Sequence, residues 1–308
     1  MPGSVITVES LSGFSALPVF HLRGAAVHTG PFLAGLLAEL KRRGLLALCL
    51  EGEPDCHTIA SHLRQCDLLF VQEKKTCPGA EQEGGDDPWC LSWPLAQRPS
   101  SSVCVDLLLA RLDALLAHSP VWGCVLIGGR SSRMGRPKHL LRDASGVTWL
   151  ERTLAVLTPQ LDGVVVSGTG TLPENLLGTP RLLDVPGLAG PAAGLLSAGR
   201  WQPLVSWLLV ACDMPLVSSE AVRWLLAERR VGRWACLPRL SGRKRGEPLL
   251  AWYDFRALPL LEEQIWQGNW RIGGLASHPR VIDPDVPVGL ERSWENINTP
   301  EELQCFQE

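Results

Sequence analysis

The most informative part of the chain is the stretch Gly123-Cys-Val-Leu-Ile-Gly-Gly-Arg-Ser-Ser-Arg-Met-Gly-Arg-Pro-Lys138. Its apolar beginning is typical of a buried parallel strand. Gly128 and Gly129 then allow the backbone to turn and to bring its N–H groups close to a ligand. Several cations follow, and backbone donors beside cations suit a triphosphate better than a single phosphate. The stretch therefore predicts a strand that ends in a phosphate-binding loop.

Length and charge limit the classes of protein to which the chain can belong. With 308 residues it exceeds the usual size of one domain, so two domains are expected. The net charge of −3 does not provide the basic field that binding to nucleic acid or a membrane surface requires. The uncharged runs are too short to span a bilayer, and the first residues lack the features of a signal peptide. We therefore expect a cytoplasmic protein with no nucleic-acid or membrane partner.

Cysteine usage points to a reducing compartment. The chain has ten cysteines but no Cys-x-x-Cys pair, so neither a disulfide framework nor a metal finger is indicated. Cys124 and Cys212 lie inside apolar runs beside the proposed site. We expect both to be buried packing residues rather than nucleophiles.

Residues 1–119 predict a separate, smaller α/β domain. Its order of strand, helix and strand favours a parallel sheet. Residues 76–102 are rich in glycine, proline and acidic side chains and predict a long loop. The link to the next domain is expected at 118–122. The expected elements are strands at Val19–Leu22, Leu45–Leu50 and Cys66–Val71 and helices at Phe32–Arg43 and Val105–Ala117.

Residues 122–308 alternate between strands and helices, which predicts a doubly wound, Rossmann-like sheet. In such sheets, ligands bind beyond the carboxyl ends of the strands. Thr299 and Glu302 fit the two positions of a capping box at a last helix. Further strands are expected at Gly163–Ser167, Arg181–Asp184, Ser206–Cys212, Trp234–Pro238 and Leu249–Tyr253. The expected helices are Val147–Leu161, one from Pro191 through Ala198, Ser219–Arg230 and Phe255–Gln267.

The string Leu126-x-Gly-Gly-x-Ser-x-Arg-Met-Gly-x-x-Lys138 resembles the signature of sugar-nucleotide-type nucleotidyltransferases. The closest resemblance is to the molybdenum cofactor guanylyltransferases. Three further motifs match that family: Gly190-Pro-Ala-Ala-Gly194, Ala211-Cys-Asp-Met-Pro215 and Asn296-x-Asn-Thr-Pro-Glu-Glu302. The resemblance covers Trp122 to near the end of the chain. It implies transfer of GMP from GTP to the phosphate of molybdenum-molybdopterin, with release of pyrophosphate and delivery of the product to a molybdoenzyme or its chaperone.

The resemblance assigns catalytic roles to Arg133, Lys138 and Asp213. Asp213 follows an apolar strand and matches the magnesium-binding aspartate of the family, so Mg²⁺ is the implied cofactor. Taken alone, an aspartate before Pro215 is also explained as a turn or capping residue. Lys138 is placed to offset the charge that builds up as pyrophosphate leaves. Arg133 is expected to be a second clamp on the triphosphate.

Nucleotide specificity is the next expectation. Asp184 corresponds to the nucleotide-contacting aspartate of the family, and a carboxylate can accept both N–H donors on the Watson–Crick edge of guanine. The pair Gly128-Gly129 also looks like the guanylyl version of the motif. Ser167 departs from the family, which usually has an asparagine there, and its hydroxyl has a shorter reach. The implied nucleotide-binding residues are Leu126, Ile127, Gly128, Gly129, Lys138, Ser167, Asp184 and Asp213.

The second substrate is expected at a basic loop. Arg243, Lys244 and Arg245 lie where the anionic pterin substrate should enter, although a solvated loop explains the same residues. Asn296 and Asn298 match the last family motif and are candidates for contacts with the pterin or the metal. Turn formation explains asparagine there equally well.

The first domain resembles, over a short stretch, the GTP-binding adapter protein of the same pathway. In residues 24–33, Gly30 and Pro31 stand where that family has the lysine and the hydroxyl of its phosphate-binding loop. The resemblance therefore implies a domain that has lost its nucleotide site, and an unrelated small α/β domain is the alternative. For the whole chain, the alternative functions are a cytidylyltransferase and a non-catalytic carrier of the molybdenum cofactor.

Overall fold

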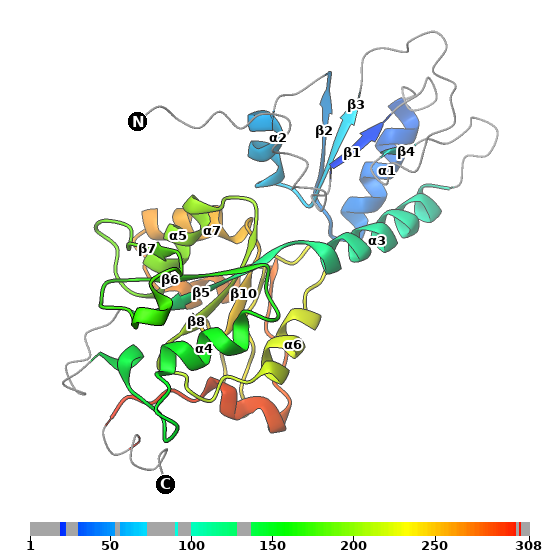
Figure 1. Cartoon of the computed structure of the whole chain (residues 1–308). Helices are drawn as coiled ribbons and strands as arrows, with labels where there is room; N and C mark the ends of the chain where they lie inside the picture. Colours follow the sequence, from blue (N-terminus) through cyan, green and yellow to red (C-terminus); the bar gives the residue numbers. More distant parts are fainter. Residues whose placement is uncertain are drawn as a thin grey trace. The chain divides into compact units, whose positions relative to one another are not determined.

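The chain divides into two compact units in the computed structural model (Figure 1). The N-terminal unit comprises Met1–Ser119 and Arg230–Gly232, and the C-terminal unit comprises Pro120–Arg229 and Arg233–Glu308. The expected link at 118–122 is too long, because one helix runs to His118 and the next strand begins at Val121. The structure describes residues 19–22, 30–52, 56–72, 90–91, 100–127, 137–299 and 302.

The N-terminal unit contains a four-stranded sheet in the order β2-β3-β1-β4, with every pair parallel as expected. Apolar side chains of α1, α3 and β3 form one core that includes Leu36, Phe70 and Leu108. Helix α2 was not expected, although its apolar residues Cys56, Ile59, Ala60 and Leu63 recur at helical spacing. The elements are β1 (Val19–Leu22), α1 (Gly30–Arg42), β2 (Ala47–Glu51), α2 (Cys56–Leu63), β3 (Leu68–Gln72), β4 (Cys90–Leu91) and α3 (Ser101–His118).

The expected loop at 76–102 is wrong in two places. Strand β4 pairs with β1 inside it, and α3 begins at its end, where the Ser100 hydroxyl accepts a hydrogen bond from the Val103 N–H at 3.4 Å. A serine in this capping position offsets an unpaired N–H of the first turn. The remainder of the loop lies outside the described residues, as do residues 23–29 of the segment compared with the adapter protein.

The C-terminal unit is built on a seven-stranded sheet in the order β11-β9-β10-β8-β5-β6-β7. All neighbouring strands are parallel except β10, which runs antiparallel to β8 and β9. The strands are β5 (Val121–Leu126), β6 (Gly163–Ser167), β7 (Arg181–Leu182), β8 (Ser206–Ala211), β9 (Ala235–Cys236), β10 (Ala251–Tyr253) and β11 (Val281–Ile282). The helices are α4 (Trp149–Leu157), α5 (Pro191–Trp201), α6 (Ser219–Ala227) and α7 (Ala257–Trp266).

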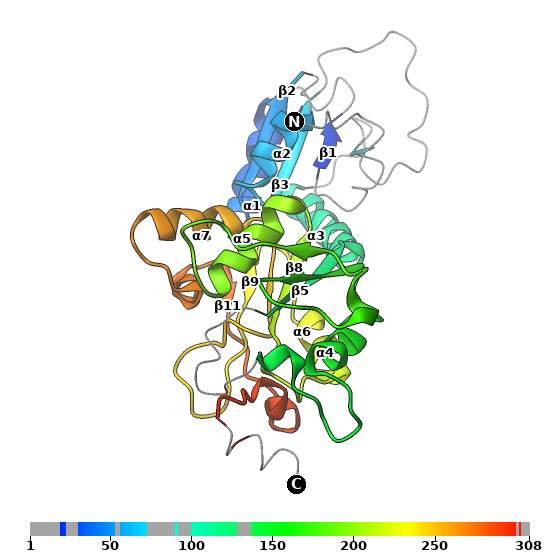
Figure 2. The same ribbon diagram turned by 60° about the vertical axis from the view of Figure 1, so that its left-hand side comes forward.

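Helices cover both faces of this sheet, which confirms the predicted doubly wound fold (Figures 1 and 2). Helices α4 and α6 pack on one face and α5 and α7 on the other. Successive residues of β5 divide between the two cores: Cys124 packs with α5 and Val125 with α4. Both cores demand apolar side chains, so the central strands are apolar throughout, and every residue of β8 is buried.

Short 3₁₀ helices complete the C-terminal unit. They are η3 (Lys138–Leu140), η4 (Glu174–Leu176), η5 (Ile272–Ser277) and η6 (Val288–Trp294). The expected capping box is present, because the Glu302 N–H donates to the Thr299 hydroxyl at 3.2 Å and the Thr299 N–H donates to the Glu302 carboxylate at 3.3 Å. Glu302 itself is helical, and the residues on either side of it lie outside the described part of the chain.

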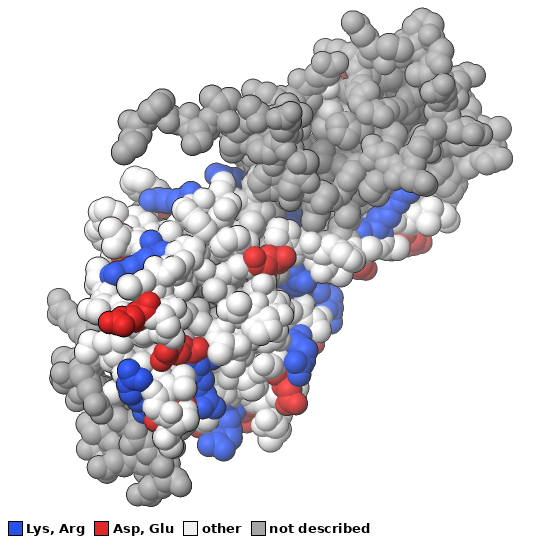
Figure 3. Space-filling model, viewed as in Figure 1, with Lys and Arg blue, Asp and Glu red and all other residues white. Residues whose placement is uncertain are grey.

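The surface of the described residues mixes charges of both signs. Figure 3 shows lysines, arginines and acidic side chains interspersed over one face, which agrees with the small net charge. Among the described helices, none has both the length and the apolar character required to cross a membrane.

Candidate functional site

The carboxyl ends of β5, β6 and β8 meet at one edge of the sheet. Leu126 lies opposite Ser167 on one side and opposite Ala211 on the other. The pairing continues one residue further, since the Ile127 N–H donates to the Ser167 carbonyl at 2.9 Å and the Cys212 N–H donates to the Leu126 carbonyl at 3.0 Å. Residues that follow these strands are therefore gathered in one place.

Lys138, Asp213 and Asn298 form a contact group at this edge. The Lys138 ammonium donates to Asp213 Oδ2 at 2.9 Å and to Asn298 Oδ1 at 2.8 Å. The side chains of Lys138 and Asp213 are 15% and 24% exposed, so the pair is shielded yet open to a ligand. Three sequence-predicted residues from distant parts of the chain thus lie in direct contact.

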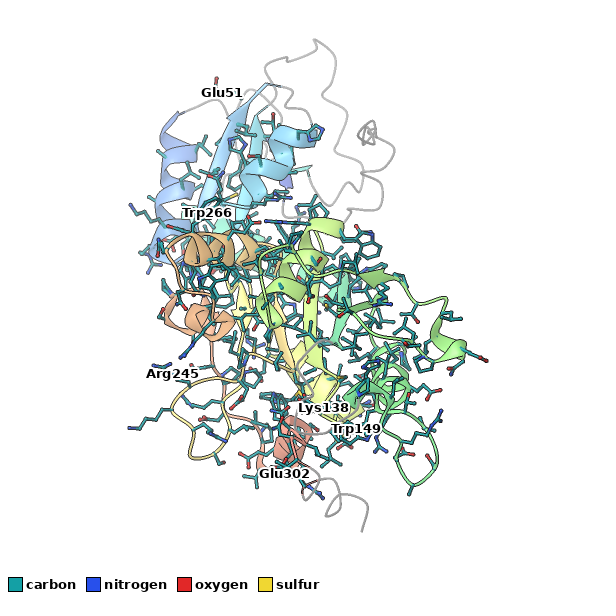
Figure 4. All side chains as sticks on the ribbon, turned by 90° about the vertical axis from the view of Figure 1, so that its left-hand side faces the viewer. Glu51, Lys138, Trp149, Arg245, Trp266 and Glu302 are labelled. Atoms are coloured by element: carbon teal, nitrogen blue, oxygen red, sulfur yellow. The ribbon has the colours of Figure 1, made fainter. Side chains whose placement is uncertain are left out.

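Backbone and apolar contacts hold this group together. The Ile297 N–H donates to the Asp213 carbonyl at 3.0 Å, which ties the last motif to the end of β8. Beside it, Leu141, Trp149 and Ile297 form a small buried cluster. Figure 4 shows Lys138, Trp149 and Glu302 in the same part of the unit. The Glu302 carboxylate also accepts from the Asn298 N–H at 2.5 Å, so capping uses Thr299 and leaves the Asn298 side chain to Lys138.

A second pair, Ser167 and Asp184, lies at the same edge of the sheet, on the other side of β5. The Ser167 hydroxyl donates to Asp184 Oδ1 at 3.4 Å, and Ser167 is 1% exposed. Asp184 follows β7 by two residues rather than ending it as expected, because β7 stops at Leu182. Ser167 thus contacts the carboxylate that the sequence motifs assign to the nucleotide.

Gly194 explains why the motif Gly190-Pro-Ala-Ala-Gly194 is glycine-rich near this pair. A Cβ added to Gly194 would lie 2.4 Å from a methyl group of Leu126 and 3.0 Å from the Ser167 hydroxyl. Gly190 caps α5 with a φ of 78°, a left-handed conformation that glycine adopts without strain. The two glycines allow α5 to begin against the ends of β5 and β6.

The buried thiols near the site have a low tendency to ionise. Burial raises the pKa of Cys212 to about 12, and the charge of Asp213 adds to this effect. Burial also raises the pKa of Cys124 far above its usual range. Since a thiolate is the reactive form, neither cysteine is suited to nucleophilic chemistry.

The basic loop borders a cavity of about 610 Å³. Arg243, Lys244 and Arg245 line one side of it, and all three are exposed. Asn269 and Arg271, from the turn that follows α7, also line it. Sequence reasoning missed these two residues, since a short polar turn between helices carries no periodic signal. Figure 4 shows Arg245 on a loop that lies away from Lys138 in that view.

Part of the predicted site lies outside the residues that the structure describes. Gly128, Gly129 and Arg133 belong to residues 128–136, which are not among the described residues. Leu126 and Ile127 precede that segment at the carboxyl end of β5, and Ile127 is 5% exposed. Asn296 and Asn298 are both exposed, and the Asn298 side chain contacts Lys138.

Comparison with known proteins agrees with this geometry. The family described as "MobA-like NTP transferase domain" matches residues 123–278. A molybdenum cofactor guanylyltransferase from Cupriavidus taiwanensis is 30% identical over 200 residues, covering 63% of this chain and 99% of the relative. A molybdenum cofactor biosynthesis bifunctional protein from Synechocystis is 28% identical over 238 residues, covering 69% of this chain and 65% of the relative.

A solved structure supports the same assignment. Molybdopterin-guanine dinucleotide biosynthesis protein A from Archaeoglobus fulgidus is 26% identical, with a TM-score of 0.50. The match covers 60% of this chain and 96% of that protein. The family match, the near-complete coverage of the Cupriavidus and Archaeoglobus proteins and the shared fold lead to one conclusion: the chain belongs to the MobA-like NTP transferase family, as its sequence motifs predict.

Proposed function

We propose that the chain transfers GMP from GTP to the terminal phosphate of molybdenum-molybdopterin, giving the guanine dinucleotide form of the cofactor and pyrophosphate. The observation that carries the proposal is the contact group of Lys138, Asp213 and Asn298 at the carboxyl edge of the sheet. The names of the relatives add the identity of both substrates. The product would pass to a molybdoenzyme or its chaperone, and the free buried thiols fit a reducing cytoplasm.

The reaction needs alignment and charge neutralisation rather than a protein nucleophile. A phosphate oxygen of the pterin substrate attacks the α-phosphorus of GTP, a P–O bond forms, and the bond to the bridging oxygen of pyrophosphate breaks. Both reactants are already ionised, so no general base is required. Lys138 brings a positive charge to the edge where phosphates would lie, and it offsets the charge on the leaving pyrophosphate.

Asp213 fits a role as a magnesium ligand. Its carboxylate is partly exposed, and oxygen is the ligand atom that Mg²⁺ prefers. In the part of the chain that the structure describes, no three His, Cys, Asp or Glu side chains are grouped to hold a metal by themselves. Asp213 would thus share the ion with substrate phosphates, a common arrangement for Mg²⁺. When bound, the ion neutralises phosphate charge.

The preference for GTP over CTP is proposed to rest on Asp184. Titration calorimetry with GTP and CTP, each with and without Mg²⁺, tests this preference and the proposed guanylyl transfer together. We expect magnesium-dependent GTP binding that is at least about tenfold tighter than CTP binding, because the carboxylate accepts two donors from guanine only. Asp184→Ala should lose this preference. Glu174→Ala removes an exposed carboxylate from the β6–β7 connection, on the other side of β7 from Asp184, and serves as the control.

Each contrary outcome identifies one of the alternative functions. A preference for CTP in the wild-type protein would indicate a cytidylyltransferase. Absence of binding to both nucleotides, with no pyrophosphate release, would indicate a non-catalytic carrier. A full GTP preference in Asp184→Ala would leave the function in place and remove Asp184 as the reader of the base.

The cavity beside the basic loop is proposed to receive the anionic pterin substrate. Arg243, Lys244 and Arg245 supply the charge, with Arg271 facing the same cavity. Gly246 fixes the loop, since a Cβ added there would lie 2.1 Å from the Leu237 carbonyl oxygen. That atom belongs to the backbone and cannot move aside cheaply.

Gly246→Ala is therefore expected to raise the KM for the pterin substrate about tenfold, because the loop and its cations must shift. The affinity for GTP, measured by calorimetry, should stay unchanged. Gly289→Ala is the control, since a Cβ at that position meets no atom within 4 Å. An unchanged KM in Gly246→Ala would exclude the basic loop from pterin binding.

A further inference from the structure

His139 is a buried polar residue next to the proposed phosphate-binding lysine. It follows Lys138 in η3 and is only 2% exposed. Its Nε2 lies 2.9 Å from the Thr171 carbonyl oxygen. A carbonyl can only accept, so Nε2 carries the proton and donates it. Burial lowers the pKa of His139, which agrees with a neutral ring.

The His139 ring packs against Gly170. This glycine has a φ of +149°, and a Cβ added to it would lie 2.8 Å from His139 Cε1 and 3.7 Å from Ile127 Cδ1. Ile127 precedes residues 128–136 and His139 follows them. Gly170 therefore lies between the two described flanks of the signature motif, and a side chain there would displace the His139 ring, whereas its contact with Ile127 would be an ordinary one.

The loop that His139 contacts is continuous with the proposed base-reading pair. It begins at Ser167, whose hydroxyl donates to Asp184. The Gly168 N–H donates to the Leu182 carbonyl at 3.0 Å, and its own carbonyl accepts from Arg181 Nε at 3.1 Å. Residues 167–171 thus form a well-connected segment, and His139 joins Lys138 to it.

The backbone of Lys138 has to be held in place by neighbouring residues, because the side-chain contacts of Lys138 do not fix its ammonium group during the reaction. An ammonium group that turns toward phosphates gives up hydrogen bonds to Asp213 or Asn298. The backbone of η3 then sets where the charge lies. On one side η3 is held by the cluster of Leu141, Trp149 and Ile297, and on the other by His139.

We propose that His139 is a positioning residue that fixes the Lys138 turn to the Ser167–Thr171 loop, so that the phosphate and base contacts of one nucleotide keep a single geometry. The proposal rests on the proposed function, because it assigns nucleotide contacts to both partners. His139 itself touches neither substrate. It acts through the position of Lys138, where a shift of about 1 Å can cost a large part of the rate.

The test compares three substitutions by GTP calorimetry with Mg²⁺, by kcat and KM for GTP, and by melting temperature. We expect His139→Ala to weaken GTP binding and lower kcat/KM about 10- to 100-fold. His139→Gln keeps an N–H that can reach the Thr171 carbonyl, so it should restore most of the GTP affinity and most of kcat/KM. His139→Leu fills the space without a donor and should remain defective.

Thr153→Val controls for the loss of a buried hydrogen bond. Thr153 is 2% exposed, and its hydroxyl donates to the Trp149 carbonyl at 2.9 Å inside α4. This variant should melt earlier yet bind GTP as the wild type does. If His139→Ala behaves the same way, or if the Gln and Leu variants bind GTP equally, His139 is a packing residue and the proposal is wrong.

The comparison of the Gln and Leu variants also decides the matter if His139→Ala does not fold. Failure of the wild-type protein to bind GTP would overturn the proposed function itself, and the positioning role with it. Normal wild-type binding combined with normal binding in His139→Leu would overturn the positioning role alone.

Discussion

Replacing Asp213 by alanine is expected to lower the rate of pyrophosphate release about 100-fold or more, as does the loss of one preorganised transition-state contact in other enzymes. The carboxylate lies two residues after β8, in contact with the proposed phosphate-binding cation of Lys138, and is the proposed ligand of the magnesium ion. The ion would then bind through phosphates alone. Calorimetry should show that GTP affinity of Asp213→Ala no longer depends on Mg²⁺, which a purely structural role would not produce.

Lys138→Ala is expected to cause a loss of similar size for a different reason. Here the carboxylate remains, so the Mg²⁺ dependence should persist while the triphosphate loses a cation. Because the two side chains touch, the double variant should lose less than the product of the two single losses. Glu262→Ala is the control, since it breaks an exposed ion pair with Arg200 on α5. Near-wild-type turnover in Asp213→Ala or in Lys138→Ala would show that the substituted residue has no catalytic role.

The sheet edge was predictable because buried parallel strands have a simple sequence signal. Strands β5, β6 and β8 are continuous apolar runs, and β6 has the bounds that the sequence predicts. Since parallel strands end at one edge, Ser167 and Asp213 could be expected near Leu126 before any coordinates. The family motifs then supplied Lys138 and Asn298, which are 160 positions apart in the sequence and whose contact depends on the fold between them.

Other features carry no local signal. Strand β11 has two residues, and it pairs with β9 only because η5 brings it there. Arg271 reaches the cavity from a turn, and its partner loop lies elsewhere in the sequence. The burial of His139 depends on Gly170, whose missing side chain leaves the space that the ring fills. Contacts of this kind are set by tertiary packing, which single-sequence patterns do not encode.

Asp254→Ala is expected to destabilise the C-terminal unit by about 3–5 kcal/mol, because it removes one side of a buried ion pair. Asp254 follows β10 and accepts from Arg256 at 2.6 Å and 3.1 Å through two guanidinium nitrogens and at 3.0 Å from its backbone N–H. The two side chains are 4% and 10% exposed. The negative charge also opposes the lowering of the pKa of Arg229, which burial causes.

Urea unfolding followed by tryptophan fluorescence measures this loss, since 10 of the 12 tryptophans follow Pro120. Asp285→Ala is the control: it removes an ion pair with Arg239 whose carboxylate is 77% exposed, and little change is expected because water screens such pairs. Equal midpoints for the two variants would show that the Arg256 pair contributes no more than a surface contact. The expected difference also bears on function, because Asp254 accepts hydrogen bonds from the backbone N–H groups of Arg256 and Ala257 at the start of α7. The turn after α7 carries Arg271 to the cavity wall.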